Sequence, residues 1–465
     1  MILKTSSHLV QIKVSRDSYV LYHSLFGRPV VVSKASVDLI KRFRNGASIA
    51  AALTKEEITK FKSSLTESRQ RRFLVGKGTD EYAILNRLYA PRRKKLNSWL
   101  GQGRPIGELR LEMASFCNFS CPHCLARKLY DWNKDSLMSF ETAKRAFDGF
   151  LWILQRNNAN HGKIVFWGGE PLLNWKVARQ VVRYVEKTVR GTPVSIDMGF
   201  VTNGSLINDR VAGFIKDHSL SATISLDGLE KDNDRFRRYV NGRGTFKSIR
   251  KGMDSLFKHG VPFWVETTLN DYNFYNVEKM IGLIHEKYNA NVFIVFPASY
   301  QCSQTDFDHH SPQEKAKRVV EIYRYGLKKH LSITIEHLYL VNAMVEGRPH
   351  LFACTGKAAI LYVKPNGLIY PCQEICTPIG DVRRIRKVVE DDNYKRVARR
   401  GVDRLAGCRG CTIEGFCAGG CAALAQFYSG DIYNTSDQRF QAFHCEYRRH
   451  LVKEMLRYLS CRESM

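Results

Sequence analysis

The chain has 465 residues, of which 44% are hydrophobic, and it carries a formal net charge of +27. This length suffices for two or three domains, and no run of about 18 apolar residues predicts a membrane span. The first residues lack the apolar segment of a signal peptide, so the expected location is the cytoplasm, where thiols stay reduced. The 13 cysteines therefore indicate metal or redox chemistry rather than disulfides.

The positive charge is concentrated near the beginning of the chain, since residues 1–105 hold 21 Lys and Arg against 7 Asp and Glu. Such a density suggests an acidic partner, which can be a nucleic acid, an acidic peptide or a phosphate-like ligand, with a plain basic surface as the ordinary alternative. The region lacks basic residues interleaved with aromatic ones, as single-strand binding proteins have them, and this disfavours nucleic acid.

Residues 1–100 predict a small domain in which strands precede helices. Strands are expected at Leu9–Val14, Ser18–Tyr22, Val30–Val32 and Arg71–Val75. Helices are expected at Ala35–Phe43 and Ser48–Leu53, and Thr54 with Glu57 predicts a capping box that begins another helix. The basic run Pro91–Lys95 is interpreted as a linker.

From residue 107 onwards, strand-like and helix-like runs alternate. The strands are expected at Glu108–Ala114, Lys163–Trp167, Ser195–Val201, Ser221–Leu226, Pro262–Leu269 and Asn291–Pro297. The helices are expected at Phe140–Arg156, Trp175–Val189, Thr245–His259, Val277–Tyr288 and Pro312–His330. Six such units predict an α/β fold with a parallel sheet and right-handed crossovers over residues 101–330. Residues 331–465 are then a bridging region and a cysteine-rich domain.

Three cysteines, Cys117, Cys121 and Cys124, follow the first of these strands with the spacing C-x3-C-x2-C. Three thiolates this close can bind three irons of a [4Fe–4S] cluster and leave the fourth iron open for a small molecule. The loop lies at the carboxyl end of the strand, where β/α barrels place their chemistry. A zinc site completed by His123 is the alternative that these residues alone leave open.

The sequence CNFSCPHC, with FWGGEPLLN about forty residues later, resembles the radical S-adenosylmethionine (SAM) enzymes. In that family the open iron binds the amino and carboxylate groups of SAM, and reduction of the cluster yields a 5′-deoxyadenosyl radical that abstracts a hydrogen atom from the substrate. The resemblance implies a partial (β/α)6 barrel, an oxidoreductase activity, and Cys117, Cys121 and Cys124 as the ligands of the catalytic cluster. It also implies SAM as a cofactor and an electron donor such as flavodoxin or ferredoxin as a partner.

The ends of the later strands resemble the segments that line the SAM pocket of this family. The resemblance assigns contacts with the SAM amino group to Gly168, Gly169 and Glu170. It assigns pocket positions to Thr202, Asn203, Ser225 and Asp227, with Asn270 as a weaker candidate. Arg237 falls where the family has an Arg that binds the SAM carboxylate, a role that suits a guanidinium. The histidine that often precedes this Arg is replaced here by Asn233.

Cysteines reappear after residue 350 as C-x12-G-x4-C, then as C-x2-C-x5-C-x3-C, and finally as Cys445. Zinc ribbons also use paired C-x2-C, so a zinc site is an alternative when the four-cysteine block is considered by itself. The whole order resembles the SPASM domain of radical SAM enzymes, which implies two auxiliary [4Fe–4S] clusters. By this resemblance the first is held by Cys354, Cys372 and Cys421, and the second by Cys408, Cys411, Cys417 and Cys445. Cys376 is a candidate fourth ligand of the first, with an open iron or a substrate ligand as the alternatives. Cys302 and Cys461 match nothing.

The layout of residues 1–100 resembles the small winged-helix module with which several peptide-maturing radical SAM enzymes bind a leader peptide. A packing extension of the barrel is the alternative. Auxiliary clusters can accept an electron, which favours a net two-electron oxidation. The sequence thus predicts a maturase of a ribosomally made precursor peptide (leader plus core), which installs a C–C, C–O or C–S crosslink between side chains.

Two other functions are weaker predictions. In sulfatase-maturing (formylglycine-generating) enzymes an Asp base follows the cysteine of the Gly-x4-Cys segment. Here Cys372 is followed by Gln373, which cannot take a proton, and then by Glu374. A metal-binding module that is not an enzyme and binds nucleic acid is the alternative from another class. No residue is singled out as the base that deprotonates the substrate.

Overall fold

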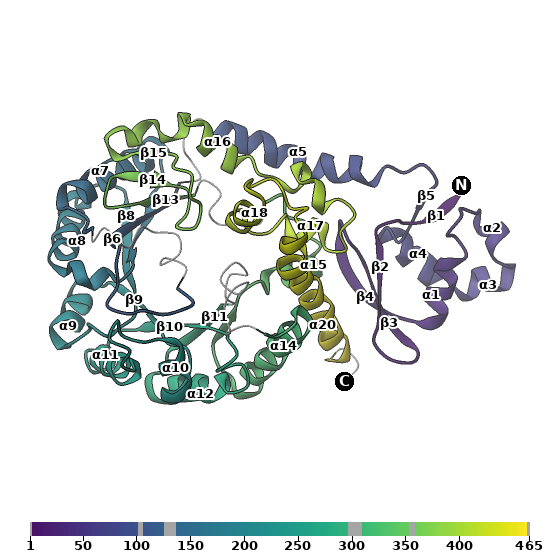
Figure 1. Ribbon diagram of the computed structural model, residues 1–465. Coiled ribbons are helices and arrows are strands. Elements are labelled where there is room, and N and C mark those ends of the chain that lie inside the picture. Colours follow the sequence, from purple (N-terminus) through teal and green to yellow (C-terminus); the bar gives the residue numbers. More distant parts are fainter. Residues whose placement is uncertain (1, 101–105, 125–135, 296–308, 353–358, 463–465) are drawn as a thin grey trace.

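The computed structural model describes residues 2–100, 106–124, 136–295, 309–352 and 359–462. It consists of a large curved sheet with helices along its outer side, a smaller N-terminal module, and a C-terminal region between the two (Figure 1). Cys302 and Cys354 lie outside the described residues. Within the described ranges, no helix has the length and apolar character needed to cross a lipid bilayer.

The N-terminal module contains two small sheets and four helices. Its elements are β1 (Leu3–Thr5), β2 (Leu9–Lys13), β3 (Ser18–His23), β4 (Gly27–Ser33), α1 (Lys34–Lys41), α2 (Ile49–Ala52), α3 (Lys55–Lys60), α4 (Lys62–Gln70) and β5 (Leu74–Gly76). Strands β2, β3 and β4 form an antiparallel sheet, and β1 pairs with β5. Leu21, Phe43 and Phe73 belong to a separate hydrophobic core of this module. The predicted capping box is confirmed, because Thr54 and Glu57 exchange both hydrogen bonds.

The interpretation of the run Pro91–Lys95 as a linker is wrong, since it lies inside the long helix α5 (Glu81–Leu100). The helix is held by tertiary contacts that local sequence does not reveal. Tyr89 is buried in a cluster with Leu351 of the C-terminal region, and Arg93 Nη1 lies 2.6 Å from Asp403 Oδ2. The basic residues thus fasten the helix to the C-terminal region.

All six strands predicted from the alternating pattern are present, within a few residues of the expected bounds. They are β6 (Glu108–Ala114), β7 (His161–Gly168), β8 (Ser195–Thr202), β9 (Ser221–Ser225), β10 (Phe263–Thr268) and β11 (Asn291–Val295). They pair in parallel and in sequence order. The sheet continues beyond the prediction with β12 (Ile333–Ile335) beside β11 and β13 (Ile360–Val363) beside β6, both parallel. Antiparallel β14 (Leu368–Tyr370) and β15 (Gly380–Asp381) complete that edge.

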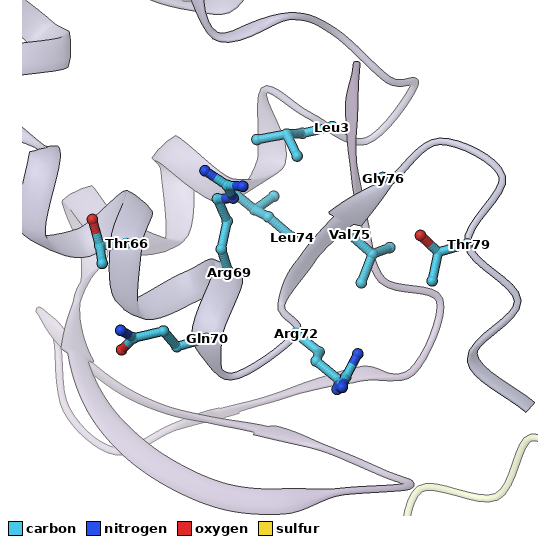
Figure 2. A pocket seen from close by; sticks show the side chains of 9 residues that line it. All are labelled: Leu3, Thr66, Arg69, Gln70, Arg72, Leu74, Val75, Gly76 and Thr79. Atoms are coloured by element: carbon cyan, nitrogen blue, oxygen red, sulfur yellow. The ribbon is translucent and has the colours of Figure 1, made fainter. Parts of the chain in front are cut away.

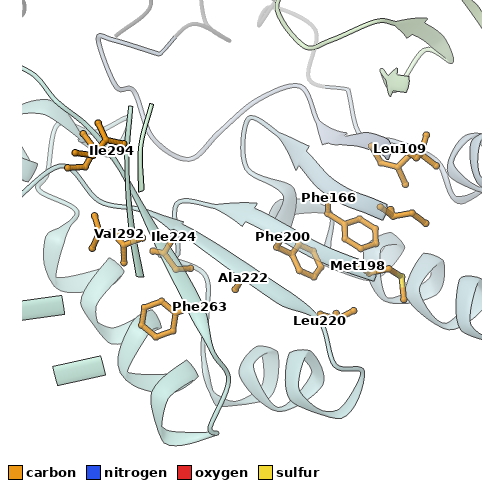
Figure 3. Packing of buried hydrophobic residues seen from close by; sticks show 14 of the residues in the cluster. Leu109, Phe166, Met198, Phe200, Leu220, Ala222, Ile224, Phe263, Val292 and Ile294 are labelled. Carbon is orange, nitrogen blue, oxygen red and sulfur yellow. The ribbon is translucent and has the colours of Figure 1, made fainter. Parts of the chain in front are cut away.

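The outer face of the sheet is covered by helices. These are α7 (Phe140–Arg156), η1 (Pro171–Asn174), α8 (Trp175–Val189), α9 (Asp209–Asp217), α10 (Glu230–Phe236), α11 (Phe246–Lys258), α12 (Val277–Tyr288) and α14 (Pro312–Lys329). The short α9 and α10 were not predicted. Alternate strand residues, among them Leu109, Phe166 and Phe200, point into the core beneath the helices (Figure 3). The residues between them, such as Arg110 and Glu112, therefore face the inner side of the curved sheet.

The C-terminal region is mostly short helices. Its elements are α15 (Tyr339–Glu346), η2 (Val382–Glu390), α16 (Asp392–Ala398), η3 (Val402–Arg404), η4 (Ala406–Cys408), α17 (Glu414–Cys417), α18 (Ala422–Ser429), α19 (Gln438–Phe440), η5 (Gln441–Cys445) and α20 (Glu446–Arg462). It contacts the N-terminal module directly, where the Gly415 N–H donates to Ser24 O at 3.0 Å. It also contacts α5, where the Tyr82 hydroxyl donates to Glu414 Oε2 at 2.9 Å.

Candidate functional site

Cys117, Cys121 and Cys124 lie together in the loop that leaves β6. The Phe119 N–H donates to Cys117 Sγ at 3.3 Å. Burial, followed by the charges of Glu170 and the other two thiols, raises the pKa of Cys117. The free thiol is therefore neutral, whereas coordination to a metal deprotonates such a group outright. Three neighbouring thiols in a backbone-supported loop fit the predicted cluster.

The glycine pair Gly168-Gly169 at the end of β7 touches the cysteine loop through its backbone. The Gly169 N–H donates to Ala114 O at 2.8 Å, and the Glu170 N–H donates to Phe116 O at 3.0 Å. A Cβ on Gly169 would lie 2.1 Å from Phe116 O, and Gly168 has a φ of +131°. Both positions thus require glycine, and the pair brings this loop against the cysteine loop.

Glu170 is fully buried and its carboxylate is occupied by its own neighbours. Oε1 accepts from the Leu172 N–H at 3.1 Å and from Thr202 Oγ1 at 2.6 Å, and Oε2 accepts from the Asn203 N–H at 2.8 Å. Burial raises its pKa to about 7, although these hydrogen bonds oppose the shift. Glu170 thus holds the ends of β7 and β8 together; its predicted contact with SAM remains a prediction.

Asn203 connects this network to the cluster cysteines. Its Nδ2 donates to Asn118 Oδ1 at 2.8 Å and lies 3.5 Å from Cys117 Sγ. Asn118 Nδ2 in turn donates to Ser205 Oγ at 3.0 Å. The sequence interpretation missed Asn118 and Ser205. The sequence signal that could have identified them is position: Asn118 directly follows Cys117, and Ser205 closes the segment that begins with Thr202.

Arg237 and Asp227, which were predicted separately as pocket residues, form a buried ion pair. Arg237 Nε lies 2.6 Å from Asp227 Oδ2, and the Thr268 N–H also donates to Asp227 Oδ1 at 2.8 Å. Arg237 is close enough to Cys121 for its charge to oppose the rise in the pKa of that thiol, which burial causes. The structure therefore gives Arg237 a carboxylate partner within the protein itself, which the sequence did not indicate.

The other residues that the sequence suggested for this site contact nearby residues of the protein or lie at the end of a strand. The His123 ring stacks on Phe236 at a centroid distance of 3.8 Å, with Nε2 3.6 Å from Asp227 Oδ2. Asn233 Oδ1 accepts from the Asp227 N–H at 3.2 Å. Asn270 bonds within its own turn, where its Nδ2 donates to Thr268 O at 2.9 Å. Ser225 is half-buried at the end of β9.

In the C-terminal region, the four cysteines assigned to the second auxiliary cluster lie together. Burial, followed by the thiols of Cys417, Cys408 and Cys411, raises the pKa of Cys445. Within the described part of the chain, no three His, Cys, Asp or Glu side chains converge as the ligands of a single metal ion do. The cysteines of a [4Fe–4S] cluster bind different irons and need not converge in this way.

The described cysteines of the first auxiliary set also approach each other. Cys372 and Cys421 pack against the same small hydrophobic cluster, and the Glu374 N–H donates to Cys372 Sγ at 3.4 Å. The predicted partner Cys354 falls outside the described residues, and Cys376 is exposed. Gln373 Oε1 accepts from Arg110 Nη1 at 2.7 Å. This bond connects the residue after Cys372 to the inner side of β6.

A separate cavity of about 430 Å³ opens in the N-terminal module between α4 and β5 (Figure 2). It is lined by Leu3, Thr66, Arg69, Gln70, Arg72, Leu74, Val75, Gly76 and Thr79. Arg69 is exposed and Arg72 is half-buried. The Arg72 guanidinium stacks on the Phe26 ring at 5.1 Å. Among the described residues, neither arginine forms an ion pair, so both charges can meet an acidic ligand.

One family model and several curated proteins are similar to this chain. Residues 111–284 match the family model described as the radical SAM superfamily. The radical SAM cyclopropyl synthase TigE of Paramaledivibacter caminithermalis is 21% identical over 453 residues, which are 92% of each chain. The serine-type anaerobic sulfatase-maturating enzyme of Bacteroides thetaiotaomicron is 28% identical over 199 residues, which are 40% of this chain and 46% of that enzyme.

Two solved structures share the fold. The structure described as native anSMEcpe with bound AdoMet has a TM-score of 0.63 at 16% identity, and the match covers 76% of this chain and 98% of that chain. Streptococcus suis SuiB bound to the precursor peptide SuiA has a TM-score of 0.57 at 13% identity, and the match covers 94% of this chain and 100% of that chain. The predicted α/β architecture of the radical SAM type is thereby confirmed.

Proposed function

The chain belongs to the radical SAM superfamily of enzymes through residues 111–284, and from that premise we propose that it matures a ribosomally made precursor peptide. The enzyme uses a [4Fe–4S] cluster and SAM, as its superfamily does. When bound, these cofactors supply the 5′-deoxyadenosyl radical that takes a hydrogen atom from the substrate. Cys117, Cys121 and Cys124 are the proposed cluster ligands, and the Gly168–Glu170 loop with Thr202 and Asn203 is the proposed seat of SAM.

The observation that carries the proposal is how much of the chain its relatives share. TigE corresponds over 92% of the chain, and SuiB, which was solved with a precursor peptide bound, corresponds over 94%. The unmatched part of the chain is in both cases shorter than the N-terminal module, so both matches include part of it. The match with anSMEcpe covers 76%. A shared N-terminal module suits recognition of a leader peptide, whereas a mere packing extension of the barrel would favour no class of substrate.

The chemistry beside Cys372 also supports peptide crosslinking over formylglycine formation. The side chain that follows this cysteine is an amide, and its oxygen accepts a hydrogen bond from Arg110 at 2.7 Å. An amide held in this way is no proton acceptor at neutral pH. A sulfatase-maturing role stays the second candidate, because relatives named as sulfatase-maturating enzymes match parts of the chain.

We assign two auxiliary [4Fe–4S] clusters to the C-terminal cysteines, as the sequence predicts. Cys408, Cys411, Cys417 and Cys445 hold one, and Cys354, Cys372 and Cys421 belong to the other. Their function is to accept the electron that a substrate radical must lose when a new bond forms. An enzyme with three such clusters works in a reducing compartment, so the cytoplasm is the proposed location and a flavodoxin or ferredoxin the proposed donor.

The cavity between α4 and β5 is the proposed contact for an acidic leader segment. Arg69 and Arg72 supply the charges, and β5 is an edge strand of its two-stranded sheet. The double variant R69E/R72E should bind the leader about fivefold more weakly, because two partly exposed ion pairs contribute about 1 kcal/mol together. Leader-independent cleavage of SAM should not change. A K13E variant on β2, outside the cavity, is the matched control.

Co-expression with any short open reading frame beside the gene, followed by intact and fragment mass measurement of the peptide, tests the function. A loss of about 2 Da per event, with fragmentation suppressed between two residues, supports an oxidative crosslink. An unchanged peptide together with continued deoxyadenosine formation would move the search to a sulfatase-type substrate. In that case a Ser- or Cys-containing sulfatase peptide is the next substrate to assay.

A further inference from the structure

The guanidinium of Arg448, near the start of α20, lies buried against a cysteine of the four-cysteine block. Its Nη1 donates to Cys417 Sγ at 3.3 Å, and the residue is only 3% exposed. An arginine does not lose its proton inside a protein. A fixed positive charge is therefore held at this sulfur.

The surroundings of Arg448 keep the guanidinium in place. Its Nη2 lies 2.5 Å from His337 Nε2, and the Cys421 N–H donates to His444 Nε2 at 3.3 Å. Gly420, with a φ of +61°, makes room, since a Cβ there would lie 2.3 Å from His444 Nε2 and 2.9 Å from Arg448 Nη1. The glycine turn after Cys417 thus folds around this arginine.

The buried charge of Arg448 has no carboxylate paired with it among the described residues. The charges that favour its protonated form are, in decreasing order, those of Cys417, Tyr339 and Glu336. A buried charge without a close partner is strongly destabilising. A neutral Cys417 thiol does not balance it, whereas a thiolate of an iron–sulfur cluster does.

We propose that Arg448 is the charge-compensating residue of the auxiliary cluster held by Cys408, Cys411, Cys417 and Cys445, and that its hydrogen bond to Cys417 raises the reduction potential of this cluster. The inference rests on the auxiliary-cluster assignment of the proposed function. Hydrogen bonds to the sulfurs and nearby positive charge favour the reduced form, which carries one more negative charge. Arg448 thereby makes this cluster easier to reduce.

The test is a redox titration, followed by electron paramagnetic resonance, of the full chain reconstituted with iron and sulfide. A background with Cys117, Cys121 and Cys124 replaced by Ala removes the signal of the catalytic cluster. R448M should shift the midpoint potential of an auxiliary cluster to more negative values. R448K keeps a positive charge, so its midpoint potential should lie between those of R448M and the wild type. R457M, on the same helix but paired with Glu454 at 2.9 Å, should leave the midpoint potential unchanged. A midpoint in R448M equal to the wild-type value, with full iron content, would overturn the inference.

Thermal unfolding with and without the clusters provides a second readout. R448M removes an uncompensated charge from the cluster-free protein, so it should lower the melting temperature of the loaded protein more than that of the cluster-free protein. Equal losses in both forms would mean a merely structural role. A C408A/C417A variant that keeps the full iron content would refute the cluster assignment itself. If that variant loses iron and R448M leaves the potential unchanged, only the inference about Arg448 fails.

Discussion

The backbone N–H of Asn203 donates a hydrogen bond to Glu170 Oε2 at 2.8 Å, and this contact joins the loops that follow β7 and β8. Through its side chain, Asn203 also reaches Cys117 Sγ at 3.5 Å. A carboxylate with no exposed surface thus connects the glycine pair, the Thr202–Asn203 segment and the cysteine loop. The geometry of the proposed SAM seat depends on this one side chain.

Replacing Glu170 with Ala should therefore damage both stability and SAM binding. Three donors, on Leu172, Thr202 and Asn203, lose their acceptor, and we expect a loss of about 3 kcal/mol in the free energy of unfolding. Urea denaturation of the cluster-free protein and equilibrium dialysis with SAM measure the two effects. E141A changes an exposed carboxylate on α7 and is the control with an effect near zero. Wild-type stability in E170A would contradict the account.

Gly169, which follows β7, and Gly107, which precedes β6, permit a matched comparison. G169A introduces a Cβ that would lie 2.1 Å from Phe116 O, whereas a Cβ on Gly107 meets nothing within 4 Å. G169A should push the loop away from the cysteines and lower the rate of SAM cleavage at least tenfold, because the reacting groups lose their alignment. G107A should behave as wild type. Deoxyadenosine formation by reduced, reconstituted protein is the measurement, and equal rates in the two variants would disprove the close approach.

Glu112 predicts a pH dependence of stability. It is 1% exposed, and burial raises its pKa to about 7, although the Tyr362 hydroxyl donates to Oε2 at 2.6 Å. The folded state holds this proton more tightly than the unfolded state does. The contribution to the free energy of unfolding is therefore full below about pH 4.5 and falls by about 3 kcal/mol as the pH rises through about 7.

The variant E112Q should remove this part of the decline. Glu170 shifts in the same direction, so some slope remains in E112Q. Urea denaturation of the cluster-free protein at about pH 5 and at about pH 7.5 compares the two states of Glu112. The same difference between the two pH values in E112Q and wild type would show that Glu112 titrates normally.

The Asp227–Arg237 ion pair predicts strong coupling between two substitutions. R237M leaves the Asp227 carboxylate buried and uncompensated, and D227N leaves the guanidinium in the same position. Each single variant should lose about 3–5 kcal/mol, and the double variant should lose much less than the sum. The measurement is denaturant unfolding of the wild type, the two single variants and the double variant, which together form a double-mutant cycle. Additive losses would mean that the two side chains act independently.

The sequence predicted those features whose cause is local. The spacing of Cys117, Cys121 and Cys124, the glycine pair and the periodic strands and helices each depend on neighbouring residues. Their bounds agree with the structure at β6 and α7. The Thr54–Glu57 capping box is a further example, since its two hydrogen bonds span only three residues.

The features that the sequence did not predict depend on contacts between distant segments. Helix α5 continues through Pro91 because Tyr89 and Arg93 meet the C-terminal region. Strand β13 joins the sheet beside β6, although about 250 residues separate Tyr362 from Glu112. Likewise, the contact of Arg448 with Cys417 crosses from α20 to α17. No local pattern marks such partners, because a single Arg or Tyr is common on any surface.

The measurement that tests the central claim most directly follows a deuterium label from the peptide into deoxyadenosine. The precursor peptide that co-expression identifies, deuterated at the side chains of its core, is incubated with SAM and the reduced, reconstituted enzyme. If the enzyme takes a hydrogen atom from this peptide, the 5′-deoxyadenosine should carry one deuterium, in proportion to the modified peptide. Cys117→Ala should give neither product. A modified peptide together with unlabelled deoxyadenosine would contradict the account.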